Sequence, residues 1–263
     1  MQITFQSLIC AFQIQAGLYR KGWVQKMKII AMDSSGLVAT VAILEEENML
    51  AEYTVNYKKT HSQTLLPMLD EIVKMIGLDL SEIDAIAVAA GPGSFTGLRI
   101  GSATAKGLGL ALDKPIIPVP TVDGLAYNMW GTSKIVCPLM DARRNQVYTG
   151  LYEFKDGKML VCSEQKAVAI EEIIEEVNTI GRPVVFLGDG VPVQKETIEK
   201  TVKVPYEFAP AHMARQSAGA LGALALEYYK EGRIEEAREH KPDYLRLSQA
   251  ERERLEKEKG TKA

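Results

Sequence analysis

A glycine-rich segment at residues 91–111 holds the residue types and spacing most suggestive of chemistry. It reads GPGSFTGLRIGSATAKGLGLA and directly follows an apolar run. This pattern predicts a strand passing through a glycine loop into a helix, with Ser94 or Thr96 capping the free N–H groups of the first turn. Such a helix start attracts anions. The segment is not a Walker A loop, because no Gly-Lys-Ser/Thr follows, and it lacks the G-x-G-x-x-G dinucleotide fingerprint.

Small residues recur at every fourth position of this segment and would share one face of the helix: Gly93, Gly97, Gly101, Ala105 and Gly109. Such a face lets another backbone approach closely. Each interior glycine costs about 1 kcal/mol of helix stability relative to alanine, so packing must hold the helix. Two interpretations stay open: the face packs within the chain's own lobe, or it packs against a helix of a partner subunit.

Histidine spacing argues against a metal site. His61 is followed four positions later by Leu65, whereas two histidines on one helical face would be spaced as metal ligands. A single histidine beside an apolar stripe is typical of a structural role, and His212 and His240 are distant in sequence. No Ser/His/Asp or Cys/His spacing indicates a nucleophile. We therefore predict no metal site and no catalytic residue.

The elements that must position the glycine-rich segment are indicated by a sequence pattern that occurs twice. Residues 28–43 and 134–151 each contain an apolar run ending in Met-Asp, at Asp33 and Asp141, then small or polar residues and a second alternating run. Each copy predicts strand, turn and strand. Because the copies lie about a hundred residues apart, they predict two similar α/β lobes in tandem that enclose a cleft.

The expected divisions follow from these copies. They are a leader or disordered extension at 1–26, with Met27 as the natural start, an N-terminal lobe at 27–120, a C-terminal lobe at 121–246 and a charged tail at 247–263. An extra strand or helix is the alternative for 1–26. Further extended elements are expected: an antiparallel strand at 50–57, a buried parallel strand at 85–90, a strand or linker at 115–121, a strand with a Gly-Asp-Gly turn at 182–190 and an extended segment at 242–246. Helices are expected at 62–76, 122–130, 166–177 and 211–229.

Composition limits the function classes. The 263 residues are 46% hydrophobic and 25% charged, enough for two modest cores. A formal net charge of −3 argues against bulk electrostatic binding of nucleic acid, so any RNA contact must be local, at Arg143-Arg144 or Lys58-Lys59. Three cysteines without C-x-x-C spacing, Cys10, Cys137 and Cys162, predict reduced core thiols and a cytoplasmic protein. The N-terminal apolar stretch is too short to span a bilayer, so we expect no membrane partner.

Tandem lobes that each open with strand, Asp turn and strand resemble the actin, sugar kinase and Hsp70 (ASKHA, ribonuclease H-like) superfamily. The resemblance implies mixed sheets flanked by helices, with the two Asp turns facing across a cleft and handling phosphates and their metal. The matching residues are Asp33, Ser34 and Asp141. The first turn lacks the glycine-rich or Lys/Arg-containing sequence that binds phosphate in working members of the superfamily. In the second turn, Arg143-Arg144-Asn145 stands where a phosphate-contacting Gly or Thr is typical. A vestigial nucleotide cleft is implied, with no required cofactor and at most weak or interfacial ATP or ADP.

Four motifs narrow the resemblance to the TsaB (YeaZ) family. They are Thr60-His61-Ser62-x-x-Leu65-Leu66-Pro67, the glycine block from Gly91 to Gly101, Met140-Asp-Ala-Arg-Arg-Asn-Gln-Val-Tyr148 and Pro242-x-Tyr244-Leu-Arg246. The resemblance covers residues 27–246. It implies a non-catalytic partner of the paralogous transferase TsaD, working with the ATPase TsaE to form N6-threonylcarbamoyladenosine at position 37 of tRNAs that read ANN codons. The tRNA would be reached through the complex.

The resemblance also implies that helices 62–76 and 94–111 pack against equivalent helices as a four-helix bundle, with TsaD in the working complex and a second copy when alone. The interface residues predicted on this basis are Leu65, Leu66, Leu69, Ile72, Val73, Gly97, Gly101, Ala105 and Gly109. The open alternative is that both stripes face the chain's own sheet. The alternative function is a stand-alone ATP-dependent phosphotransferase or ATPase, which needs Asp33 and Asp141 to bind Mg-ATP. Glycoprotease activity has no nucleophile or metal constellation to support it.

Overall fold

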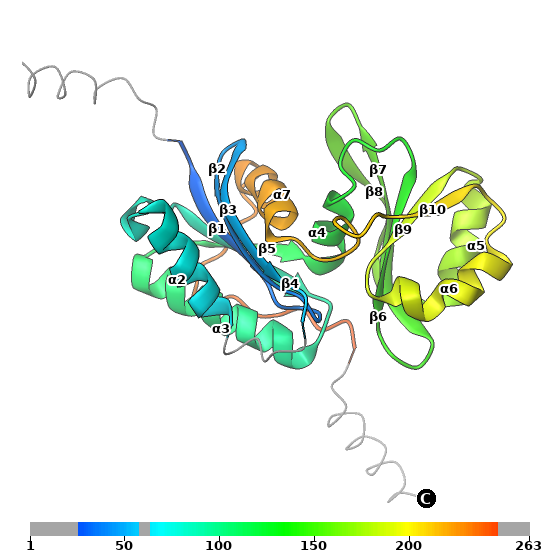
Figure 1. The fold of residues 1–263 in the computed structure, drawn as a ribbon, viewed down its shortest axis with the longest axis horizontal. Helices are drawn as coiled ribbons and strands as arrows, with labels where there is room; N and C mark the ends of the chain where they lie inside the picture. Colours follow the sequence, from blue (N-terminus) through cyan, green and yellow to red (C-terminus); the bar gives the residue numbers. More distant parts are fainter. Residues whose placement is uncertain (1–25, 58–63, 247–263) are drawn as a thin grey trace, which may run out of the picture.

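The computed structural model describes residues 26–57 and 64–246, which form two five-stranded mixed sheets flanked by helices (Figure 1). The expected leader, apart from Lys26, and the expected tail at 247–263 lie outside these residues. His61 and the Lys58-Lys59 pair lie outside them too. None of the described helices is long and apolar enough to cross a membrane.

The first sheet has the strand order β3-β2-β1-β4-β5. Its strands are β1 Lys28–Asp33, β2 Ala39–Glu45, β3 Asn48–Val55, β4 Ala85–Gly91 and β5 Ile116–Pro120. β1, β2 and β3 form an antiparallel meander, whereas β4 runs parallel to β1 and β5 parallel to β4. Every residue of β4 is buried, which explains why this strand is apolar throughout rather than alternating.

The second sheet repeats the first. Its strands are β6 Ile135–Asp141, β7 Gln146–Lys155, β8 Lys158–Ala169, β9 Val184–Leu187 and β10 Tyr206–Phe208. The order β10-β9-β6-β7-β8 has the same antiparallel and parallel pairings in the same sequence positions. Both predicted hairpins are therefore confirmed, as are the two tandem α/β lobes with mixed sheets flanked by helices.

Helices cover both faces of each sheet (Figure 1). They are α2 Leu65–Ile76, α3 Phe95–Leu112, α4 Thr121–Tyr127, α5 Ile170–Ile180, α6 Gly190–Thr201 and α7 Ala218–Lys230, with a short 3₁₀ turn η2 at Leu80–Glu82. α2 and α3 share one face of the first sheet, and α7 packs on the other. α5 and α6 lie on one face of the second sheet and α4 on the other, so α4 and α7 lie between the sheets.

Two helices begin several residues later than predicted. The helix expected at 166–177 begins at Ile170, because β8 continues to pair with β7 as far as Ala169. The helix expected at 211–229 begins at Ala218, since the Asn128 side chain donates to the carbonyls of Met213 and Arg215 at 3.0 and 2.6 Å and holds that stretch as a loop. α6, which starts within the Gly-Asp-Gly turn, was not predicted.

The C-terminal part of the chain returns to the first lobe. Small side chains line the sheet face opposite α2 and α3, including Ala31, Ala42 and Ala87, and they allow α7 to pack closely there. Glu235 exchanges both backbone hydrogen bonds with Ile116, at 2.9 Å each, and so covers the edge of β5. The expected C-terminal lobe at 121–246 therefore needs correction: α7 and the following residues pack on the first lobe, because its second apolar face must be covered.

Candidate functional site

The Asp33 turn and the glycine loop close on each other. The Ser34 hydroxyl donates to the Gly97 carbonyl at 2.9 Å, and the Ser94 N–H donates to the Ser35 carbonyl at 2.7 Å. The Asp33 carboxylate accepts from the Ser35 N–H at 2.7 Å. Each residue of the Asp33–Ser35 turn is at most 3% exposed. The predicted phosphate-binding turn is thus packed under the start of α3.

Gly97 makes this closure possible. A Cβ atom there would lie 1.9 Å from the Ser34 carbonyl oxygen, and one at Gly101 would lie 2.8 Å from the Ser34 hydroxyl. The helix start is capped by Ser94, whose hydroxyl accepts from the Gly97 N–H at 3.3 Å; Thr96 has no capping role. The small-residue face therefore packs within its own lobe, the first of the two interpretations.

The second aspartate turn is more open. Asp141 accepts from the Arg143 N–H at 2.8 Å, and its other carboxylate oxygen lies 3.4 Å from the Arg143 guanidinium. Its own N–H donates to Asp189 at 3.1 Å, and burial raises the pKa of Asp189. Arg143, Arg144 and Asn145 all adopt left-handed backbone conformations, with φ of 66°, 56° and 58°. Asp33 and Asp141 are thus each engaged by their own turn.

Most of the predicted interface residues are core residues. Leu65, Leu69 and Ile72 are at most 4% exposed and Ala105 is fully buried, all packed against the first sheet. Gly97, Gly101 and Gly109 are buried as well, so these seven positions offer no surface to a partner. Leu66 is 52% exposed and Val73 is half-buried. Helical periodicity predicted that the apolar residues of α2 share a stripe. It did not show which of them pack on the chain's own sheet and which are exposed to a partner.

The C-terminal segment, residues 231–246, runs along α3 back to the glycine loop. The Lys106 ammonium donates to the carbonyls of Arg238 and His240 at 2.9 and 3.1 Å. The Asp243 N–H donates to the Ala90 carbonyl at 2.6 Å. Gly91 has φ of 120°, and a Cβ atom there would lie 2.1 Å from the Asp243 carbonyl oxygen. Glycine is therefore required at this crossing.

The end of this segment bridges the two lobes. The ring of Tyr244 stacks on that of Phe95, with centroids 4.4 Å apart and planes 3° apart. Its hydroxyl accepts from Arg99 Nε at 3.3 Å. The Arg246 guanidinium donates to the Ala142 carbonyl in the β6–β7 turn. The sequence indicated only an extended segment here, since nothing in the spacing pairs Tyr244 with Phe95.

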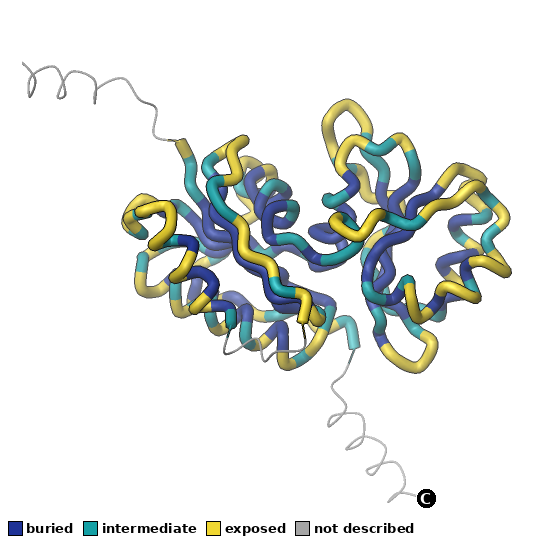
Figure 2. The backbone as a smooth tube through the Cα atoms, in the orientation of Figure 1, coloured by how far each residue is buried: buried dark blue, intermediate teal, exposed yellow. Residues whose placement is uncertain are grey.

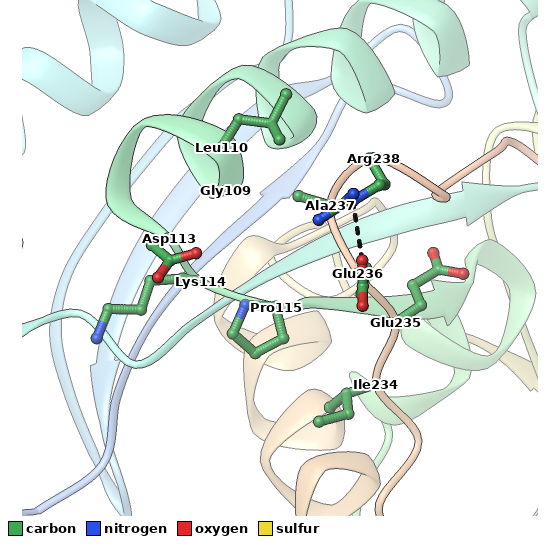
Figure 3. A pocket seen from close by; sticks show the side chains of 10 residues that line it. All are labelled: Gly109, Leu110, Asp113, Lys114, Pro115, Ile234, Glu235, Glu236, Ala237 and Arg238. Atoms are coloured by element: carbon green, nitrogen blue, oxygen red, sulfur yellow. Dashed lines mark ion pairs between the residues drawn. The ribbon is translucent and has the colours of Figure 1, made fainter.

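A surface pocket of about 420 Å³ lies at the opposite end of α3 (Figure 3). Its walls are the helix end around Gly109 and Asp113 and residues 234–238 of the C-terminal segment. A Cβ atom at Gly109 would lie 2.7 Å from the Ala237 Cβ, so the two walls meet closely there. Arg238 and Glu236 form an ion pair at 2.9 Å on the wall. Because the charges of the pocket are mixed and partly paired, they select no ligand class.

A buried carboxylate joins the lobes at their centre. Asp123 of α4 is 8% exposed and accepts from Tyr152 of β7 at 2.7 Å and from Tyr228 of α7 at 2.8 Å. Burial raises the pKa of Asp123, and the two tyrosine hydrogen bonds oppose that rise. The Arg233 guanidinium lies 3.3 Å from the centroid of the Tyr228 ring. This cluster ties the second sheet to α7, and its members are too far apart in sequence to be predicted together.

The two described cysteines differ in their surroundings. Cys137 is buried in the second core, and burial raises its thiol pKa to about 12. Cys162 lies exposed on β8, so its prediction as a core thiol is wrong; β8 is an edge strand with one open side. No group of three or more His, Cys, Asp or Glu residues within 26–57 and 64–246 is placed to hold a metal ion.

Comparison with known proteins gives a consistent set of matches. Residues 48–254 match the sequence profile described as TsaD: tRNA N6-adenosine threonylcarbamoyltransferase. The tRNA threonylcarbamoyladenosine biosynthesis protein TsaB of Bacillus subtilis is 34% identical over 89% of this chain and all of its own length. TsaB of Escherichia coli is 28% identical over 84% of this chain and 95% of its own. The solved structure of YeaZ from Pseudomonas aeruginosa is 28% identical, with a TM-score of 0.72, covering 83% of this chain and all of its own.

Proposed function

Because the chain belongs to the TsaB (YeaZ) family of tRNA threonylcarbamoyladenosine biosynthesis proteins, we propose that it is the non-catalytic partner subunit of the TsaD transferase. The complex would form N6-threonylcarbamoyladenosine at position 37 of tRNAs that read ANN codons, with TsaE as its ATPase. The site of action would be the cytoplasm.

The observation that carries this proposal is a set of exposed apolar side chains on α2 and α3, and Figure 2 shows exposed positions along both helices. Leu66 and Met75 of α2 and Leu110 of α3 are 52%, 74% and 61% exposed, and the small residues Ala103 and Gly107 of α3 are exposed as well. An exposed apolar patch on a folded domain is typical of a protein interface. A helix pair of the partner laid across this side would form a four-helix bundle.

A four-helix contact of ordinary size would make a specific interface. A standard interface buries about 1,600 Å² in total, which two crossed pairs of helices can supply. A two-fold homodimer would use the same patch on both copies, so homodimer and TsaD complex would compete. We therefore propose that the chain forms a homodimer when alone and exchanges it for TsaD.

The alternative, a stand-alone phosphotransferase or ATPase, has no comparable support. It requires the Asp33 turn to hold Mg-ATP, and this turn is at most 3% exposed beneath the start of α3. A nucleotide phosphate would have to displace the Ser34–Gly97 and Ser94–Ser35 contacts. We propose accordingly that the Asp33 turn has a structural role and that the chain needs no nucleotide of its own.

The test uses one exposed residue on each lobe. Leu66→Glu places a charge on the outer side of α2, and Val193→Glu places the same charge at a 61% exposed position of α6. Each variant is mixed with the TsaD of the same organism, and the mass is measured by light scattering on a sizing column. We expect Leu66→Glu to lose the complex and Val193→Glu to keep it. Equal complex formation by both variants would refute the proposed interface.

A further inference from the structure

Four arginines gather where the C-terminal segment meets both lobes. Arg99 lies on the first turns of α3, Arg246 ends the C-terminal segment, and Arg143 and Arg144 form the β6–β7 turn. Three contacts bring the elements that carry them together: Arg99 Nε to the Tyr244 hydroxyl at 3.3 Å, Phe95 stacked on Tyr244, and the Arg246 guanidinium on the Ala142 carbonyl. We call this the arginine surface (Arg99, Arg143, Arg144 and Arg246).

Within residues 26–57 and 64–246, few ion pairs compensate the positive charge of this surface. Arg99 donates to a neutral hydroxyl and Arg246 to a backbone carbonyl. Within the part of the chain that the structure describes, Arg143 is the only one of the four that forms an ion pair. Its guanidinium lies 3.4 Å from the Asp141 carboxylate, and the Arg143 side chain is 85% exposed. The nearby described carboxylates are Asp141, Asp189, Asp243 and Glu171; Asp189 accepts from the Asp141 N–H and Glu171 from Asn145. The guanidinium groups of Arg99, Arg144 and Arg246 thus have no ion-pair partner among the described residues, on a chain whose formal net charge is −3.

Aromatic rings lie among these arginines. Tyr244 is 37% exposed and stacks parallel to the half-buried Phe95, and the Arg99 guanidinium lies 5.9 Å from the Phe95 centroid. The start of α3, with Ser94 exposed, adds the positive end of an 18-residue helix. A guanidinium group can donate two parallel hydrogen bonds to the oxygens of one phosphate. Exposed aromatic rings and guanidinium planes can also stack on unpaired bases.

Contacts on both sides hold the backbone of the β6–β7 turn in place. The left-handed conformation costs about 1–2 kcal/mol at each of Arg143 and Arg144, whereas Asn145 tolerates it, so contacts with the surroundings must hold the turn. The Asp141 carboxylate accepts from the Arg143 N–H, and the Arg246 guanidinium holds the adjacent Ala142 carbonyl. The turn is therefore tied to both its own strand and the C-terminal segment.

We propose that the arginine surface binds the sugar-phosphate backbone of the tRNA that the complex modifies. This inference rests on the proposed function, because it takes the tRNA as the substrate of the assembly. RNA fits better than an acidic protein segment, since stacked rings among arginines serve nucleotides as well as phosphates. With four guanidinium groups, the surface contributes a few phosphate contacts and leaves recognition of the modified base to other parts of the complex.

The experiment measures tRNA binding against salt. The full chain is titrated with fluorescent tRNA, alone and with TsaD, between 50 and 200 mM KCl. The variants are Arg144→Ala, the double variant Arg99→Ala/Arg144→Ala, and the control Arg238→Ala. Arg238 is an exposed arginine of the C-terminal segment that lines the pocket at the other end of α3. Light scattering and urea unfolding on the same samples establish complex formation and folding.

We expect the double variant to bind tRNA roughly tenfold or more weakly at the lower salt, with the slope of log affinity against log salt reduced by about 1.5. Arg144→Ala should show about half that change in slope, and Arg238→Ala none. Unchanged affinity and slope in the folded double variant, with or without TsaD, would overturn the proposal. Lost TsaD binding with unchanged tRNA binding would also overturn it, because the surface would then dock a protein. Failure of the wild-type chain to bind TsaD would instead count against the proposed function.

Discussion

Replacing Gly97 by alanine tests the closure of the glycine loop on the Asp33 turn. The added Cβ atom would lie 1.9 Å from the Ser34 carbonyl oxygen, whereas real Cβ atoms keep at least 3.0 Å from such a neighbour. The turn and α3 must therefore separate by more than about 1 Å. That separation lengthens the Ser34–Gly97 and Ser94–Ser35 hydrogen bonds, which now measure 2.9 and 2.7 Å.

The size of the effect follows from three terms. Overpacking a well-packed site costs about 1–3 kcal/mol, and each weakened buried hydrogen bond adds about 1 kcal/mol. Alanine recovers at most about 1 kcal/mol of helix propensity. We expect Gly97→Ala to lower the free energy of unfolding by about 2–4 kcal/mol.

Gly107→Ala on the same helix is the matched control. Gly107 is exposed, and no described atom lies within 4 Å of a Cβ placed there. This variant should gain about 0.5–1 kcal/mol of stability from helix propensity alone. Urea unfolding followed by circular dichroism measures both. If Gly97→Ala were as stable as Gly107→Ala, the closure would not depend on backbone contact, and the structural role assigned to the Asp33 turn would fail.

Three further predictions concern the buried groups. Tyr152→Phe removes one donor from the buried Asp123 carboxylate and should cost about 1–3 kcal/mol in urea unfolding; an unchanged urea midpoint would show that the hydrogen bond does not stabilise the lobe junction. Burial raises the pKa of Asp123 in the folded chain, so its contribution is most favourable below about pH 4 and is lost as pH rises through the raised value. The stability of the wild type relative to Asp123→Asn should therefore fall from pH 4 upward, and a rise would contradict this. In native protein, a thiol reagent should label Cys162 quickly and Cys137 only on unfolding, by peptide mapping, because Cys137 is buried with its pKa raised to about 12; fast labelling of Cys137 would contradict its burial.

Much of the fold could be predicted because its signals are local. The Met-Asp turns at Asp33 and Asp141 mark both hairpins, and the apolar run before Gly91 marks a strand buried on both faces. Ser94 was one of two caps compatible with the sequence, and it is the one that accepts from Gly97. Local patterns of this kind depend on neighbours a few residues apart, which the sequence displays directly.

The features that the sequence did not predict depend on contacts between residues far apart in the chain. α7 has the Ala-rich pattern of any buried helix, and nothing in that pattern says that it crosses back to the first sheet. For the stripes of α2 and α3 the sequence leaves both a partner interface and the chain's own sheet open, and most of those positions prove to be buried in the chain itself. The Asp123 cluster and the Phe95–Tyr244 stack join residues more than 25 positions apart, so no spacing reveals them.

The most direct test of the central claim is tRNA modification by mixed subunits. Purified chain, TsaD, or both are supplied with TsaE, tRNA and threonylcarbamoyl-adenylate, and modified adenosine is measured by mass spectrometry in the sizing-column fractions. The account predicts modification only in the mixed complex, its loss with Leu66→Glu and its retention with Val193→Glu. Equal modification by TsaD without this chain, or by the Leu66→Glu mixture, would contradict the account.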